Sequence, residues 1–156
     1  MATAPPHAPN PQVSLSYGPS LTLADARRIT DAARHHAECH GLPMVIAIVD
    51  AAGHLVLIER MDDAQLGSIA VAQQKAETAV RFRRPTRTFE AGLEAGTLGI
   101  RALTMAGISA IDGGLPLVRD GKVIGAIGVS GMLPTQDAAV AQAGATALND
   151  TSPDLD

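Results

Sequence analysis

The stretch MVIAIVDAAGHLVLIER, residues 44–60, carries the clearest fold signal in the chain. Residues 44–50 form a continuous apolar run with several β-branched side chains, which predicts a buried strand. Residues 51–54, AAGH, predict a turn, and residues 55–60 predict a second strand. Because so short a connection cannot hold a helical crossover, the two strands are expected to form an antiparallel hairpin.

The segment before this hairpin predicts a helix over residues 22–40. Thr22 is suited to the N-cap position, and Asp25, three residues later, completes a capping box. Gly41 and Pro43 end the helix. One face of it carries residues at i, i+3 and i+4 spacing, namely Ile29, Ala33, His36, Ala37 and His40.

The segment after the hairpin predicts two more helices, three strands and a last helix. A helix is expected over residues 67–82, with Ile69, Ala72, Ala76 and Ala79 on one face. Pro85 breaks the pattern, and Thr86 is expected to cap a short helix that ends at Leu93. Residues 95–106 fit no clear pattern. Residues 109–131 predict three strand pieces separated by turns at 112–113 and 120–121, and residues 135–148 predict a helix.

This order of elements predicts a single α/β (α+β) domain over residues 21–150. Strands joined by hairpins favour a mainly antiparallel sheet, and the helices would cover its faces. The core must be aliphatic, because 46% of the 156 residues are hydrophobic but only 2% are aromatic. Residues 1–20 are rich in proline and predict a flexible arm, and residues 151–156 predict a frayed tail.

Composition excludes several classes of function. A net charge of −4 gives the chain no electrostatic attraction to nucleic acid, and its few aromatic residues offer no base-stacking platform. The single cysteine cannot form an intrachain disulfide. No apolar run is long enough to cross a membrane, and no signal peptide is evident, so a cytoplasmic location is expected. The local basic cluster predicts a surface or interface that faces an anionic ligand; it consists of Arg81, Arg83, Arg84 and Arg87.

Several ordered blocks of this sequence resemble the GlcG/HbpS family, which includes haem-binding proteins and the C-terminal domain of PduO-type proteins. The blocks are LTLADARRI (21–29), IAIVDAAGHLVLIERMDDA (46–64), IAVAQQKAETAVRFRRPT (69–86), GGLPLVRDGKVIGAIGVSG (113–131) and QDAAVAQAG (136–144). The resemblance implies a profilin-like sandwich around a five-stranded antiparallel sheet. It also implies a homo-oligomer that binds a small ligand, haem or a related tetrapyrrole being the expected one.

Four side chains that can bind metal lie near the end of the first predicted helix: His35, His36, Cys39 and His40. His36 and His40 are at i, i+4 spacing, so neutral imidazoles there could bind a metal or haem iron. The sequence HHAECH lacks the H-E-x-x-H pattern of zinc proteases. His36 is the expected haem-iron ligand because it lies on the inward stripe. The alternative is that these histidines interact with the helix C-terminus and bind nothing.

Lys75 is a second candidate, since a lysine on an alanine-rich helix face is costly to bury without a partner or an anion. Asp62, after the second strand, could pair with it across a pocket, with Thr78 one turn beyond Lys75. The group could anchor a carboxylate or a haem propionate, or it could be a salt bridge that fixes helix to strand.

The glycine-rich segment does not match a dinucleotide-binding motif or a G-x-S-x-G nucleophile elbow, because Met132 replaces the last glycine of the latter. Its glycines are expected to permit tight strand packing or close ligand approach. The resemblance implies that Gly113 and Gly114 form a pocket wall. Its expected mouth, where the last helix begins and backbone N–H groups favour an anion, consists of Ser130, Gln136 and Asp137. Asp137 could instead simply stabilise the helix N-terminus.

Two functions are therefore open. The first is an oligomeric binding protein for haem, a tetrapyrrole or a small anion, with no nucleic-acid or membrane partner. The second is a cofactor-independent enzyme acting on a small organic acid, with Lys75, Asp62 and Asp137 as acid–base groups and the arginines holding a carboxylate. An accessory or scaffold subunit is a third possibility.

Overall fold

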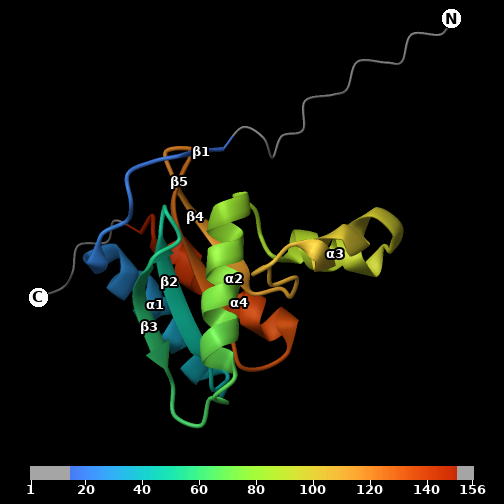
Figure 1. Ribbon diagram of the computed structural model, residues 1–156. Coiled ribbons are helices and arrows are strands. Elements are labelled where there is room, and N and C mark those ends of the chain that lie inside the picture. Colours follow the sequence, from blue (N-terminus) through green and yellow to red (C-terminus); the bar gives the residue numbers. More distant parts are fainter. Residues whose placement is uncertain (1–14, 151–156) are drawn as a thin grey trace, which may run out of the picture.

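The computed structural model describes residues 15–150, apart from the side chains of residues 97 and 98. Five strands and five helices follow one another in this part of the chain (Figure 1). The strands are β1 (Ser16–Tyr17), β2 (Val45–Asp50), β3 (Leu55–Arg60), β4 (Gly114–Arg119) and β5 (Lys122–Ser130). The helices are α1 (Leu23–Cys39), α2 (Ser68–Phe82), α3 (Arg87–Glu94), the 3-10 helix η2 (Thr97–Thr104) and α4 (Pro134–Ala147).

Strand β5 is the centre of the sheet. It pairs antiparallel with β2, from Val45↔Ser130 to Asp50↔Gly125, and antiparallel with β4, from Gly114↔Gly128 to Arg119↔Lys122. β2 pairs antiparallel with β3, which confirms the predicted hairpin. β1 pairs with β5 in parallel, so the sheet is mixed rather than purely antiparallel.

Helices cover both faces of this sheet. α2 packs across β5, β2 and β4 on one face, while α1 and α4 pack together on the other (Figure 1). α3 and η2 contact each other and project from the side of the sandwich. The interior of the sandwich is aliphatic, as the composition predicts.

The predicted capping box of α1 is confirmed. The Thr22 side chain accepts a hydrogen bond from the Asp25 backbone N–H at 3.1 Å, and the Asp25 carboxylate accepts one from the Thr22 N–H at 3.0 Å. Both bonds satisfy backbone donors that have no partner within the helix. The expected helix over residues 22–40 is thus α1 with its two caps.

Three predicted elements need correction. Residues 109–111 are not a strand; the fifth strand is β1, which lies in residues assigned to the flexible arm. Tyr17 is held there because its hydroxyl donates to the carbonyl oxygens of Val80 and Arg81 at the end of α2. Thr86 is the N-cap residue of α3, as predicted, but its side chain makes no capping bond; its hydroxyl accepts the N–H of Gly114 at 2.9 Å instead. The remainder of the predicted arm, 1–14, and the predicted tail, 151–156, lie outside the described residues.

Close contact between α2 and the sheet depends on Gly128. A Cβ at this position would lie 2.0 Å from the Ala72 carbonyl oxygen and 2.5 Å from the Ala76 nitrogen. Ala72 and Ala76 are fully buried, as predicted, whereas Ile69 on the same expected face is 40% exposed. The helix therefore lies directly on β5, close enough for a side chain of α2 to reach past the strand.

Candidate functional site

Lys75 of α2 and Asp137 of α4 form a buried ion pair at the end of β5. The Lys75 Nζ donates to Asp137 Oδ2 at 2.7 Å and to the Val129 carbonyl oxygen at 2.9 Å. Lys75 is 1% exposed and Asp137 is 2% exposed. Because α2 and α4 lie on opposite faces of the sheet, this pair joins the two helical layers.

Two glycines at the start of β4 make room for the lysine. A Cβ on Gly113 would lie 2.9 Å from the Lys75 Nζ and 2.7 Å from the Val129 oxygen. A Cβ on Gly114 would lie 2.5 Å from the Lys75 carbonyl oxygen. These glycines were expected to line a ligand pocket, and here they pack around a protein ammonium group.

Burial raises the pKa of the Asp137 carboxyl above its ordinary value. The hydrogen bond and the charge of Lys75 act in the opposite direction, as do the backbone N–H groups of Met132 and Gly131. Asp137 Oδ1 accepts the Met132 N–H at 3.1 Å, so the carboxylate also orders the loop that leads into α4. Asp137 was expected either at the mouth of a pocket or as a stabiliser of the helix start; in the structure it pairs with Lys75 and also holds the segment that precedes α4.

Asp62 is not the partner of Lys75, contrary to the expected pairing. It is exposed in the loop after β3 and lines a shallow cleft of about 390 Å³ with Arg34, Glu38 and Glu59. The chain turns at Met61–Asp63 toward the end of α1 rather than toward α2. The three expected acid–base groups are consequently split between a buried pair and an exposed carboxylate.

The remaining residues expected to bind ligand at the sheet end form internal hydrogen bonds. The Thr78 hydroxyl donates to the Gln74 carbonyl oxygen and accepts the Ser109 N–H at 2.9 Å. The Ser130 hydroxyl bonds to the Ser68 hydroxyl at 3.1 Å. Gln136 is half-buried, and its Oε1 accepts the Leu133 N–H at the start of α4. These polar groups stabilise the packing around the Lys75–Asp137 pair.

The histidine pair occupies a different part of the surface, at the C-terminal end of α1. The rings of His36 and His40 stack with their centroids 4.4 Å apart. His40 Nδ1 lies 2.8 Å from the His36 carbonyl oxygen. A carbonyl can only accept, so Nδ1 is the donor, and in the neutral imidazole Nε2 then carries the lone pair. His40 is exposed and His36 is half-buried.

Exposed apolar side chains lie in two loops near the segment that follows α1. α1 and α4 pack together, and a Cβ on Gly131, just before α4, would lie 2.4 Å from the carbonyl oxygen of Pro43, just after α1. Met132 and Leu133 precede α4 and are 45% and 64% exposed. The side-chain amide of Gln65 donates to the Gly131 carbonyl, which brings Leu66, 71% exposed, to the same end. We call Leu66, Met132 and Leu133 the apolar patch.

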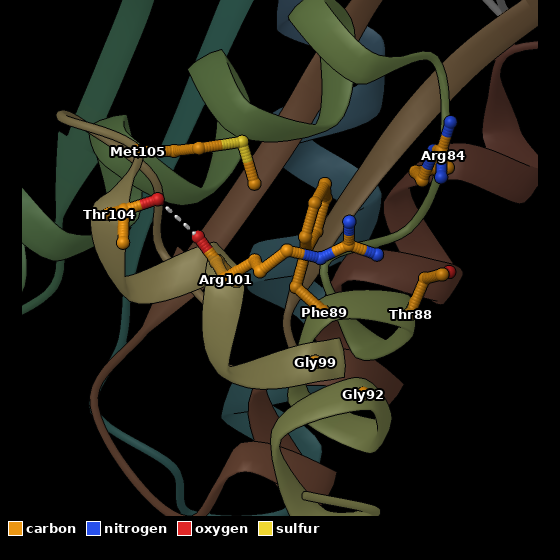
Figure 2. A pocket seen from close by; sticks show the side chains of 9 residues that line it. Arg84, Thr88, Phe89, Gly92, Gly99, Arg101, Thr104 and Met105 are labelled. Carbon is orange, nitrogen blue, oxygen red and sulfur yellow. Dashed lines mark hydrogen bonds between the residues drawn. The ribbon is translucent and has the colours of Figure 1, made fainter. Parts of the chain in front are cut away.

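A separate pocket of about 480 Å³ lies between α3 and η2 (Figure 2). Its lining combines two arginines, an aromatic ring, two threonines and a methionine: Arg84, Arg101, Phe89, Thr88, Thr104 and Met105. Of the four arginines expected to face an anion, only Arg84 lines this pocket. Arg81 pairs with Glu77, Arg87 pairs with Glu90 and Glu94, and Arg83 donates to the Leu15 carbonyl.

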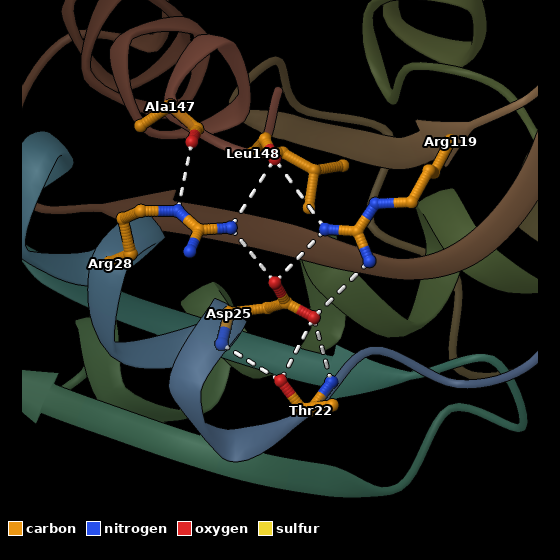
Figure 3. A network of polar contacts seen from close by, with 6 residues as sticks. All are labelled: Thr22, Asp25, Arg28, Arg119, Ala147 and Leu148. Carbon is orange, nitrogen blue, oxygen red and sulfur yellow. Dashed lines mark hydrogen bonds and ion pairs between the residues drawn. The ribbon is translucent and has the colours of Figure 1, made fainter. Parts of the chain in front are cut away.

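A third charged cluster joins the start of α1 to the end of α4 (Figure 3). Asp25 accepts hydrogen bonds from Arg28 and Arg119, each at 2.9 Å. Both guanidinium groups also donate to the Leu148 carbonyl oxygen beyond the last turn of α4. The Arg119 guanidinium holds the pKa of the Asp25 carboxyl far below its usual range. This cluster is a structural clamp, because every group in it bonds to another.

Within residues 15–150, no three His, Cys, Asp or Glu side chains are grouped so that they could hold a metal ion. Among the helices of that same stretch, none is long and apolar enough to span a bilayer.

Comparison with known proteins places these features in a family. The family model for "Haem degrading protein HbpS-like" matches residues 21–146. The chain belongs to the HbpS-like family. Protein GlcG of Escherichia coli K12 is 37% identical over 110 residues, which cover 70% of this chain and 81% of GlcG.

Two solved structures of the family have the same fold. Klebsiella pneumoniae protein ORFY superposes with a TM-score of 0.80 at 29% identity, covering 88% of this chain and 96% of ORFY. PduOC, whose crystal structure is a complex with haem, superposes with a TM-score of 0.76 at 34% identity, covering 83% of this chain and 96% of PduOC. The expected family and α+β fold are therefore confirmed.

Two features escaped the sequence reasoning. The Lys75–Asp137 pair joins residues far apart in the chain, and only the spacing of Gly113 and Gly114 before a strand could have indicated that a long side chain passes there. Arg101 lies in a segment with no clear pattern and Phe89 in a separate predicted helix, so nothing in their neighbours indicated a shared pocket.

Proposed function

We propose that this protein binds haem or a related tetrapyrrole at the end of α1, with an imidazole of the His36–His40 pair as the iron ligand. The hydrogen bond from His40 Nδ1 to the His36 carbonyl carries the proposal. Proteins usually orient a metal-binding histidine by a hydrogen bond from its other ring nitrogen to a carbonyl or carboxylate oxygen. His36 was the expected ligand; the geometry favours the Nε2 of His40, with His36 stacked behind it.

The surroundings of the pair fit a flat, largely apolar macrocycle. Met132 and Leu133 of the apolar patch offer exposed hydrophobic contact beside the end of α1. No acidic side chain is ion-paired to either ring of the His36–His40 pair among the described residues. Haem iron, when bound, takes a neutral imidazole as an axial ligand. The haem complex of PduOC supports the same class of ligand for this family.

The test is a titration of the purified chain with haemin, followed in the Soret region. We expect the free-haemin spectrum to convert to that of an imidazole-ligated complex, and we expect His40→Ala to abolish this conversion. His54→Ala is the matched control, because His54 is exposed on the β2–β3 turn at the other end of the hairpin. A spectrum unchanged by both His40→Ala and His36→Ala, but lost in Cys39→Ser, would assign a thiolate ligand and refute the proposal.

We also propose that the chain assembles with itself, and that the apolar patch takes part in the contact. Leu66 and Leu133 expose most of their side-chain surface, which is unfavourable in water unless another surface covers it. Light scattering coupled to gel filtration is expected to give a multiple of 16.0 kDa for the wild type and a smaller mass for Leu133→Asp. Identical masses for both proteins would exclude the patch as the contact.

A further inference from the structure

We propose that the pocket between α3 and η2 binds a small aromatic carboxylate, independently of the histidine site. Its volume of about 480 Å³ lies within the usual range of small-molecule sites. Two helical segments and the α2–α3 connection build it, and Figure 2 shows the labelled side chains arranged around one space.

The backbone fixes the shape of this pocket. A Cβ on Gly99 would lie 1.7 Å from the Gly92 carbonyl oxygen, so α3 and η2 touch through their main chains at this point. The helices are in direct contact there, and the side chains that precede Gly92 and follow Gly99 form the two walls. Backbone contact therefore fixes the spacing of the two helices that carry these walls.

Charge gives the pocket its preference for an anion. Arg84 is half-buried, and its Nε donates to the Phe82 carbonyl. Within residues 15–150 no carboxylate forms an ion pair with it, in contrast to Arg81 and Arg87. The Arg101 side chain extends past the Phe89 ring toward the side of the pocket where Thr88 and Arg84 lie (Figure 2). A guanidinium group binds carboxylates with paired, charge-assisted hydrogen bonds.

An aromatic body matches the remaining walls. Phe89 presents its ring to the pocket and is held edge-on against Phe82, with centroids 5.1 Å apart. Met105 lines the same space, and its thioether contacts aromatic rings favourably. The Arg84 guanidinium carbon lies over the Phe89 ring, 5.9 Å from its centroid, so the charge and the ring are neighbours in the pocket lining. A ligand with a carboxylate attached directly to an aromatic ring can bond to the guanidinium group and pack against Phe89 and Met105 at the same time.

Benzoate is the probe, with benzamide as its neutral counterpart and inorganic phosphate as an anion without a ring. Binding is followed by NMR of the full chain. We expect benzoate to shift the backbone amides of residues 88–92 and 101–105, and benzamide to bind roughly tenfold more weakly because it lacks the charge. Phosphate that binds as tightly as benzoate would overturn the aromatic specificity.

Variants separate this site from general charge effects. Arg84→Gln is expected to weaken benzoate roughly tenfold or more, and Phe89→Leu is expected to weaken benzoate while leaving the fold intact. Arg87→Gln is the control, since Arg87 is exposed and paired with Glu90 and Glu94 outside the pocket. Benzoate binding that is absent in the wild type, or equal in Arg84→Gln and Arg87→Gln, would refute the proposal. His40→Ala is expected to leave benzoate binding unchanged.

Discussion

Replacing Lys75 by methionine should strongly destabilise the fold. The substitution keeps the length and apolar stem of the side chain but removes the ammonium that binds Asp137 at 2.7 Å. Because Asp137 is 2% exposed, its carboxylate would then be buried without a compensating charge. Breaking a buried ion pair in this way costs about 3–5 kcal/mol of unfolding free energy. A domain of this size has roughly 5–15 kcal/mol in total, so the loss is a large fraction of its stability.

Urea unfolding followed by circular dichroism measures this loss. The double variant Lys75→Met, Asp137→Leu removes both charges and should lie within about 2 kcal/mol of the wild type, the remaining deficit including the hydrogen bond that Asp137 accepts from the Met132 N–H. Arg87→Met is the control, and as an exposed pair it should cost less than about 1 kcal/mol. A loss below about 1 kcal/mol for Lys75→Met, or a double variant no more stable than the single one, would refute the reasoning.

The same variant should also gain a pH dependence. Without the ammonium, burial raises the pKa of Asp137 further, and a group with a raised pKa in the folded state contributes stability at low pH that is lost as the pH rises through that pKa. Lys75→Met should therefore be more stable at pH 5 than at pH 8. A flat profile would show that Asp137 is solvated after the substitution.

Three further perturbations test other parts of the structure. Asp25→Asn should cost about 1.5–3 kcal/mol at neutral pH, because it weakens charge-assisted bonds to Arg28 and Arg119. The pKa of Asp25 is lowered in the folded protein, so the clamp contributes fully above the ordinary aspartate pKa and is lost as the pH falls toward the depressed value; the difference in urea stability between wild type and variant should begin to narrow below about pH 4. Gly128→Ala should cost about 3 kcal/mol, since its Cβ would overlap the backbone of α2, whereas Gly67→Ala, with no atom within 4 Å, should cost little in thermal unfolding. A Gly113→Ala protein as stable as the wild type would contradict the close passage of Lys75 past β4.

Local signals predicted most of the fold. The capping residues Thr22 and Asp25, the apolar run at 44–50 and the alanine spacing of α2 act over a few residues, and each element formed where these signals are strong. The misassigned fifth strand shows the limit of such signals. β1 spans only Ser16–Tyr17, and it depends on pairing with β5 and on the Tyr17 hydroxyl at the end of α2.

The candidate sites depend more on tertiary contacts. Lys75 was recognised as a buried charge in need of a partner, but its partner could not be chosen from sequence, because Asp62 and Asp137 both follow strands. The direction of the loop after β3 and the position of α4 decided in favour of Asp137. Similarly, spacing placed His36 and His40 together, while the proton position that favours His40 depends on a backbone hydrogen bond.

Electron paramagnetic resonance of the ferric haem complex tests the proposed function most directly. The wild type should give the signal of imidazole-ligated iron, His40→Ala should lose it, and free imidazole added to His40→Ala should restore it by occupying the vacated position. The same imidazole-type signal in His40→Ala without added imidazole, together with its persistence in His36→Ala, would contradict ligation by this pair.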